Sequence, residues 1–233
     1  MTEPGDPLTR RQAKAEHQGR SRRNKLAPDP DVRRAIVAAA SESVRERGGW
    51  GLSVAAVLKH ARLSTRAFYR HFESKDELVA AVFTEMARAE VRRLKAKMAT
   101  AATPVEAVAA WIDGRIDLAF NDGVEPELRQ MPPGAPSAVF NSPELISPAY
   151  AAILEPLVEQ LERGLEIGVF RGIVPAVAAK SIHGAVWAGT QPQWETGHTK
   201  RAEVRERAIR FCLRGLGVAP EAIEEIADEP PTA

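Results

Sequence analysis

Apolar residues recur three and four positions apart along most of the chain, which is the spacing of helices that bury one face. The first stripe after residue 30 holds Ile36, Val37, Ala40 and Val44. No stretch shows the strict alternation of apolar and polar residues that is typical of a half-buried strand. The pattern therefore predicts an all-α fold with about nine helices.

Two short apolar stripes lie between residues 52 and 72, and each begins with Leu-Ser. Ser53 and Ser64 are preferred N-cap residues, and Leu52 and Leu63 stand where a hydrophobic staple would pack onto the fourth helical residue. The pattern predicts two short helices joined by a three-residue turn.

Further helices are expected downstream. Ser74 and Glu77 form a capping box that opens a long helix. Beyond residue 100, helical stripes cover 104–121, 148–168, 176–190 and 200–216. Two stretches rich in Pro, Gly and Asn, 122–147 and 191–199, are expected to be irregular.

These elements predict a small domain followed by a larger one. Residues 1–30 are basic and nearly free of apolar side chains, so we expect a flexible tail. The expected order is the tail, a small three-helix domain over 31–76, a larger helical domain over 77–218 and a C-terminal tail over 219–233.

The charge is unevenly distributed although the net charge is only +1. Residues 1–76 hold 16 Lys/Arg and 9 Asp/Glu, a balance of +7, while residues 77–233 hold 16 and 22, a balance of −6. A basic N-terminal part favours a polyanionic partner.

Several classes of protein are disfavoured. The sequence has no run of about 18 apolar residues that could span a membrane. The N-terminus lacks the apolar core of a secretory signal. The single Cys212 leaves no internal disulfide, so the cytoplasm is the expected compartment. The motifs of common hydrolases, metalloproteases and nucleotide-binding enzymes are missing, and the five His are scattered. We expect neither catalysis, nor a metal, nor a cofactor.

The second short helix suggests a function. In "LSTRAFYRHF", Phe68 and Phe72 share one side, while Arg66 and Arg70 point away. A capped short helix with two Phe is often only a packing element. Two short helices between two longer ones nevertheless match the helix-turn-helix plan, whose second helix enters the DNA major groove.

The run "SVAAVLKHARLSTRAFYRHFESKDEL" resembles the N-terminal domain of the tetracycline-repressor (TetR) family of transcriptional regulators. The positions in register are Ser53, Ala61, Ser64, Tyr69, Phe72, Lys75 and Leu78. Arg62 departs from the pattern, because the turn usually has Gly there, and it is expected to hold a strained left-handed conformation.

The resemblance implies a set of DNA contacts. Thr65, Arg66 and Ala67 would meet base edges, with Arg66 suited to a guanine. The other residues would hold phosphates or flanking bases: Tyr69, His71, Lys75, Ser53 and Ser64. A backbone contact from Arg33 or Arg34 would add to these. The basic tail would lie along DNA or remain unbound.

The resemblance also implies a homodimer that reads a palindromic operator, paired through the last two helices. Small and apolar faces there are compatible with pairing: Ala178, Ile182, Ala185, Val186 and Gly189, then Val204, Ala208, Ile209, Phe211, Cys212 and Leu216. The alternative is that both faces belong to the core of one chain.

A small-molecule effector site, if the chain has one, is expected among the middle helices. The candidate lining is Trp111, Arg115, Phe120, Phe140, Tyr150, His183 and Trp187. Each of these residues is individually more typical of an ordinary core. The prediction is a repressor released by this ligand; the alternative is an activator or a ligand-independent DNA-binding protein of the same fold.

Overall fold

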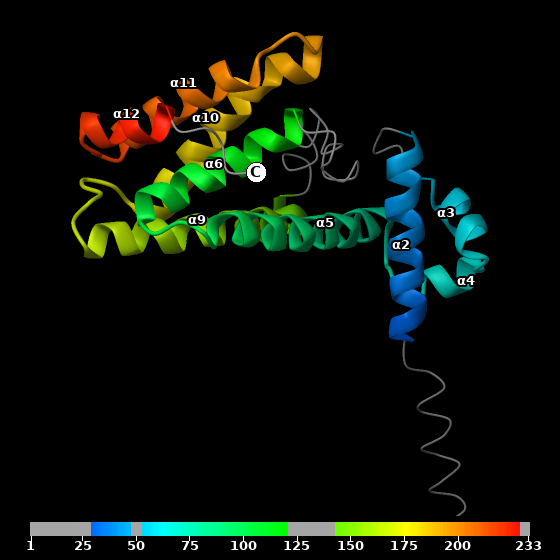
Figure 1. Ribbon diagram of the computed structural model, residues 1–233. Helices are drawn as coiled ribbons and strands as arrows, with labels where there is room; N and C mark the ends of the chain where they lie inside the picture. Colours follow the sequence, from blue (N-terminus) through cyan, green and yellow to red (C-terminus); the bar gives the residue numbers. More distant parts are fainter. Residues whose placement is uncertain (1–28, 48–52, 121–142, 229–233) are drawn as a thin grey trace, which may run out of the picture.

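The computed structural model describes residues 29–47, 53–120 and 143–228, and all regular structure within them is helical. The all-α prediction is confirmed, with nine helices in the described ranges. At one end of the molecule lie α2 (Pro30–Arg47), α3 (Val54–Ala61) and α4 (Thr65–Phe68) (Figure 1). These three helices form the N-terminal domain.

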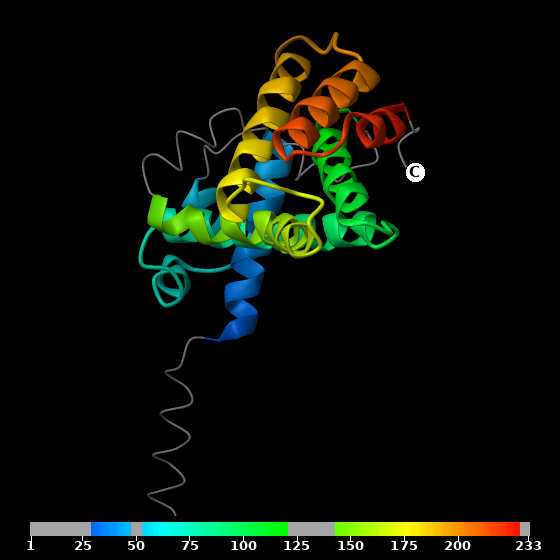
Figure 2. The same ribbon diagram turned by 90° about the vertical axis from the view of Figure 1, so that its left-hand side faces the viewer.

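The long helix α5 (Lys75–Met98) runs from the N-terminal domain into a larger helical domain (Figure 1). The remaining helices are α6 (Pro104–Phe120), α9 (Pro143–Glu166), α10 (Pro175–Thr196), α11 (Arg201–Gly215) and α12 (Pro220–Asp228). The view turned by 90° shows α10 and α11 side by side above α9 (Figure 2).

The expected serine caps of the short helices are confirmed. The backbone N–H of Ala56 donates to Ser53 Oγ at 3.4 Å, and that of Ala67 donates to Ser64 Oγ at 3.3 Å. Each bond satisfies one of the amides that a helix start leaves without a partner. The α-helical part of "LSTRAFYRHF" is nevertheless only Thr65–Phe68, shorter than the stripe suggested.

The capping box of α5 is also confirmed. Ser74 Oγ accepts from the N–H of Glu77 at 3.1 Å. The Glu77 carboxylate accepts from the N–H of Glu73 at 2.7 Å, one residue before the cap itself. Both ends of this box hold the chain at the point where it enters α5.

The turn between α3 and α4 has the expected left-handed residue. Arg62 has φ 54° and ψ 39°, the one positive φ among the described non-glycine residues. Its N–H donates to Lys59 O at 3.3 Å, and the N–H of Leu63 donates to Leu58 O at 2.9 Å. This closure ends α3 in the manner of a helix C-cap, where glycine is the usual residue.

Two apolar cores are joined by α5. The N-terminal core contains Leu78, Val82 and Met86 from this helix, and the larger core contains Leu94 and Met98 from its second half. A single continuous helix therefore belongs to both domains.

Three boundaries differ from those expected. The irregular stretch 122–147 ends early because α9 begins at Pro143, and α10 continues through Pro192 to Thr196 where 191–199 was expected to be irregular. The expected C-terminal tail contains α12, which buries Ile223 and Ala227. Residues 1–28, the basic tail included, and residues 121–142 lie outside the described ranges.

Helix α12 is held by a buried arginine as well as by apolar contacts. Arg205 on α11 donates to Ala227 O at 2.9 Å and to Ile226 O at 3.2 Å, and its Nε bonds to Asp113 on α6 at 2.8 Å. The last carbonyls of a helix are otherwise unsatisfied, so this arginine completes the end of α12. None of the helices in the described ranges is long and apolar enough to cross a membrane.

Candidate DNA interface and ligand cavity

Helix α4 is fixed to the N-terminal core by two aromatic rings. Phe68 and Phe72 are each 1% exposed, and their rings stack with centroids 5.6 Å apart. The guanidinium carbon of Arg33, on α2, stands 4.8 Å from the centroid of the Phe72 ring. A four-residue helix cannot persist alone, so these contacts hold its position.

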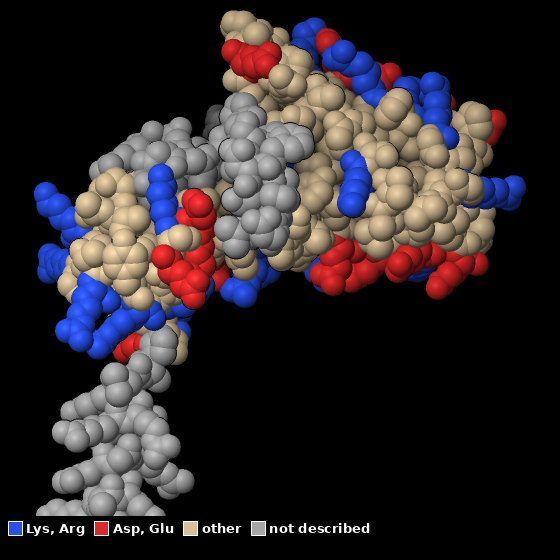
Figure 3. Space-filling model, turned by 180° about the vertical axis from the view of Figure 1, so that it is seen from behind, with Lys and Arg blue, Asp and Glu red and all other residues tan. Residues whose placement is uncertain are grey.

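The opposite side of this segment is polar and exposed. Thr65, Arg66 and Arg70 are exposed, and Tyr69 is 67% exposed with its ring edge-on to Phe68. Lys and Arg side chains gather over this end of the molecule (Figure 3). The sequence expectation that two Phe rings face inward while the polar residues face outward is confirmed.

Most of the residues expected to contact DNA are exposed, and two of them are partly buried. Ser53, Ser64 and Lys75 are exposed at the starts of α3, α4 and α5, whereas Ala67 is half-buried. His71 is also half-buried, and its enclosed Nδ1 has no hydrogen-bond partner within the described residues. His71 is therefore less available to DNA than its neighbours.

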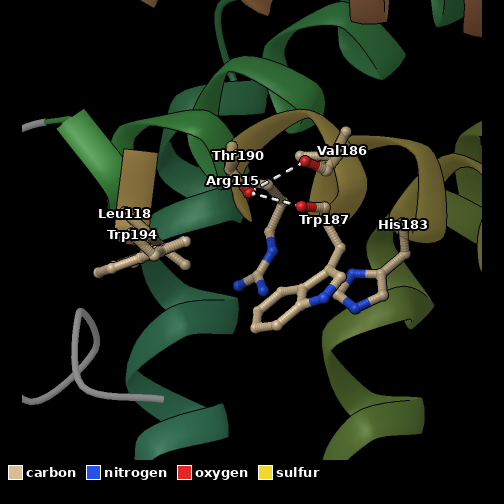
Figure 4. A pocket seen from close by; sticks show the side chains of 7 residues that line it. All are labelled: Arg115, Leu118, His183, Val186, Trp187, Thr190 and Trp194. Atoms are coloured by element: carbon tan, nitrogen blue, oxygen red, sulfur yellow. Dashed lines mark hydrogen bonds between the residues drawn. The ribbon is translucent and has the colours of Figure 1, made fainter. Parts of the chain in front are cut away.

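The larger domain holds a small cavity between α6 and α10 (Figure 4). It encloses about 360 Å³ including its solvent-open mouth, of which about 20 Å³ is wide enough for a water molecule. The lining side chains are Arg115, Leu118, His183, Val186, Trp187, Thr190 and Trp194.

Three residues of the expected ligand set line this cavity: Arg115, His183 and Trp187. Trp111 and Tyr150 lie behind it, with ring centroids 6.2 and 5.0 Å from that of His183. Phe120 packs against the larger core and does not line the cavity. Phe140 lies outside the described residues.

Trp111 belongs to the core, as the alternative interpretation held. It is 0% exposed, and its indole N–H donates to Ile153 O at 3.4 Å. Phe170 and Leu157 are similarly buried in the same core. Trp111 therefore supports the cavity wall without forming its surface.

His183 is neutral near pH 7. Burial, and to a smaller extent the positive charge of Arg115, lowers its pKa to about 3. Its Nδ1 is enclosed and has no partner in the described part of the chain. Burial also raises the pKa of Tyr150, against the opposing effect of Arg115.

Sequence reasoning missed four lining residues: Leu118, Val186, Thr190 and Trp194. Trp194 was missed because α10 was expected to end before Pro192, whereas the helix continues and brings this side chain to the cavity wall. The spacing of His183, Val186, Trp187 and Thr190 could have identified the middle of this stripe. Thr190 turns its hydroxyl to its own helix, at 3.0 Å from Val186 O (Figure 4).

The cavity borders the N-terminal domain. Leu118 is 4% exposed and belongs to the N-terminal core, and Trp194 packs against that core. Both side chains also line the cavity. A movement of either side chain in the cavity would therefore also alter the packing of the N-terminal core.

The helices expected to pair in a dimer divide between core and surface. Ile182, Val204 and Ile209 are buried within the chain, which agrees with the alternative of an intramolecular core. Phe211 is 69% exposed beside a shallow, largely apolar groove on α10 and α11. The groove is lined by Ala185, Ala188, Gly189, Pro192, Thr199, Val204, Arg207, Ala208 and Phe211.

Comparison with known proteins identifies the N-terminal domain. The family described as "Bacterial regulatory proteins, tetR family" matches residues 36–82. The HTH-type transcriptional regulator BetI of Brucella suis is 32% identical over 88 residues, which are 38% of this chain and 44% of that protein. The chain thus matches less than half of the length of this curated relative.

Solved structures resemble a larger part of the chain. RolR in complex with resorcinol has a TM-score of 0.64 at 18% identity, over 87% of this chain and 96% of that one. SmeT, the repressor of the Stenotrophomonas maltophilia multidrug efflux pump SmeDEF, has a TM-score of 0.56 at 21% identity, over 78% and 89%. These likenesses concern the fold. Residues 36–82 thus match the tetR family of bacterial regulatory proteins, and the chain as a whole shares the fold of these solved structures.

Proposed function

We propose that the chain is a sequence-specific DNA-binding transcriptional regulator, and that it acts as a homodimeric repressor released from a palindromic operator by a small molecule. The observation that carries the proposal is the segment around α4, which is anchored by Phe68 and Phe72 and exposes Thr65, Arg66 and Tyr69. A helix presented in this way fits the major groove of B-DNA.

Within this interface the residues have different roles. Arg66 reads a guanine by bidentate hydrogen bonds, and Thr65 and Ala67 contact neighbouring base edges. Tyr69 and Lys75 bind phosphates, and the Ser53 and Ser64 hydroxyls donate to phosphates while their oxygens cap the helices. His71 contributes least because its ring is half-buried.

The proposed dimer uses the groove on α10 and α11. Phe211 projects beside the small residues Ala185, Ala188 and Gly189, and small residues allow a second pair of helices to approach closely. Two copies related by a twofold axis would present two α4 segments to successive major grooves, about one helical turn or a multiple apart.

The position of the cavity supports release by a ligand. A molecule that displaces Leu118 or Trp194 alters side chains that belong to the N-terminal core or pack against it. The ligand then favours a state in which the two α4 segments have the wrong spacing, and linkage requires operator DNA to weaken ligand binding by the same factor.

The test is selection of a random duplex library by the full chain at about 150 mM salt, which suppresses non-specific binding. An enriched inverted repeat is expected. Binding without any enriched sequence would overturn the proposal of sequence-specific recognition. An enriched single half-site would retain sequence reading and overturn the dimer, and a transcription assay on the selected site would then separate a repressor from an activator.

A further inference from the structure

The cavity has an excess of positive charge behind its aromatic wall. The Glu90 carboxylate, on α5, is 0% exposed and is already paired with Arg93, whose Nε and Nη2 donate to its two oxygens at 2.9 Å each. Arg115 Nη1 donates to the same carboxylate at 2.7 Å. Two guanidinium groups thus share one carboxylate, which leaves one positive charge without a counterion in this cluster.

The positive charge that Glu90 leaves unbalanced lies at the cavity, because Arg115 lines the cavity and Arg93 does not. The Arg115 side chain is 5% exposed, and among the described residues its ion-pair partner is Glu90. An arginine fork carries five N–H donors, so its Nε and Nη2 remain for a second acceptor. Figure 4 shows the guanidinium beside the indole of Trp187.

The nearby carboxylates on α6 do not neutralise Arg115. Asp113 bonds to Arg205 Nε at 2.8 Å, and Asp117 bonds to Arg201 Nη2 at 2.6 Å and to Lys97 Nζ at 3.1 Å. Each therefore has at least one cation of its own. None of the described residues that line the cavity is Asp or Glu.

The rest of the wall is aromatic and apolar. Trp187 and Trp194 supply two flat indole rings, and Leu118 and Val186 supply aliphatic surface. His183 adds an imidazole nitrogen at the same wall, and this Nδ1 has no hydrogen-bond partner among the described residues. Flat rings pack well against indoles, so the wall fits a planar, apolar ligand body.

We infer that the cavity takes a small aromatic carboxylate, with the carboxylate on Arg115 and the ring against Trp187 and Trp194. The inference rests on the proposed function, because it names the ligand class of the proposed sensor. Arginine and carboxylate match in geometry and form charge-assisted hydrogen bonds. An aromatic box can also bind a cation, but the unshared charge of Arg115 repels one.

Binding requires the wall to move. Only about 20 Å³ of the hollow is wide enough for a water molecule, which is far less than a ring occupies. Trp187 and Trp194 are both half-buried, so a change of side-chain conformation is the way to make room. Trp194 also packs on the N-terminal core, so that movement reaches the DNA-binding domain.

The inference is tested with three kinds of probe of similar size: benzoate and 2-naphthoate, their uncharged amides, and benzyltrimethylammonium. Calorimetry and thermal unfolding of the full chain measure their binding. The carboxylates are expected to bind about tenfold more tightly than the amides, and the cation is expected not to bind. Arg115→Gln removes the preference for carboxylate, whereas Lys95→Gln, which removes an exposed cation of α5, preserves it.

Equal binding of acids and amides, preferred binding of the cation, or no binding by either carboxylate would overturn the inference. The wild-type comparison decides the matter even if Arg115→Gln fails to fold. Operator binding is measured in parallel with each probe. Release of DNA by the amides alone would overturn the ligand class and retain the proposed sensor. Binding of the carboxylates without release of DNA would retain the ligand class and overturn the proposed sensor.

Discussion

Arg33 on α2 stands over the ring of Phe72, with its guanidinium carbon 4.8 Å from the ring centroid. The next residue, Arg34, pairs instead with Asp31 of its own helix at the surface. The two adjacent arginines therefore have different partners. Arg33 helps to hold the segment that carries α4, and Arg34 remains on the solvent side of α2.

This difference predicts unequal losses of stability. Arg33→Ala should lower the free energy of unfolding by about 0.5–1 kcal/mol, the range for an exposed cation–π contact. Arg34→Ala should cost less than about 0.5 kcal/mol, as for an exposed pair one turn apart. Urea unfolding of both variants measures this, and equal losses would mean that the Phe72 contact contributes nothing measurable.

The proposed base contact of Arg66 predicts a change in specificity. Arg66→Ala should cost about 1–3 kcal/mol on the selected operator and relax the preference at one base position in each half-site. Lys75→Ala should weaken binding to all sequences alike and flatten its dependence on salt. Fluorescence anisotropy on specific and random duplexes distinguishes the two, and equal losses on both duplexes for Arg66→Ala would place it among phosphate contacts.

The shared carboxylate predicts a large effect on stability. Glu90→Gln leaves Arg93 and Arg115 without their buried counterion, and removing one member of such a buried cluster typically costs about 3–5 kcal/mol. The control is Glu85→Gln on the same helix, whose exposed pair with Arg88 should contribute less than about 1 kcal/mol. Chemical denaturation compares them, and a small loss for Glu90→Gln would show that the two arginines find other partners.

Gly164 predicts a steric effect in the larger core. A Cβ at this position would stand 2.0 Å from Cδ2 of Phe170, whose ring is 1% exposed. Gly164→Ala should therefore cost at least about 1–3 kcal/mol through forced repacking. Gly184→Ala meets nothing within 4 Å and should stabilise α10 by up to about 1 kcal/mol. Thermal unfolding measures both, and similar shifts for the two variants would contradict the predicted clash.

The lowered pKa of His183 predicts that the free energy of unfolding depends on pH. Its pKa is about 3 in the folded chain and about 6.5 when unfolded, so below pH 6.5 the unfolded chain binds a proton that the native chain does not. The native state should lose about 1.4 kcal/mol per pH unit between these values. His183→Phe removes that loss, so the wild type should fall about 2 kcal/mol relative to the variant from pH 6.5 to 5. Parallel stability curves over this range would contradict the prediction.

The sequence predicted local features of the helix-turn-helix because they depend on neighbouring residues. The caps at Ser53, Ser64 and Ser74 and the left-handed Arg62 are each decided within a few positions of the chain. The inward side of Phe68 and Phe72 follows from helical spacing. These contacts need no knowledge of the rest of the fold.

Long-range features could not be predicted in the same way. Arg115 was expected at the cavity, but its pairing with Glu90 joins residues on different helices, which no spacing reveals. The continuation of α10 through Pro192 brought Trp194 to the cavity, although proline there favoured an end to the helix. Helix α12 was missed because its support comes from Arg205 on another element.

Helix α5 contributes to both cores without interruption, so a small tilt at one of its ends displaces the other end. At about 1.5 Å per residue its 24 residues span about 36 Å. A tilt of about 5° at one end displaces the other by about 3 Å, close to the rise between base pairs of DNA. In the proposed mechanism, a tilt of this size would be enough to change the spacing of the two α4 segments.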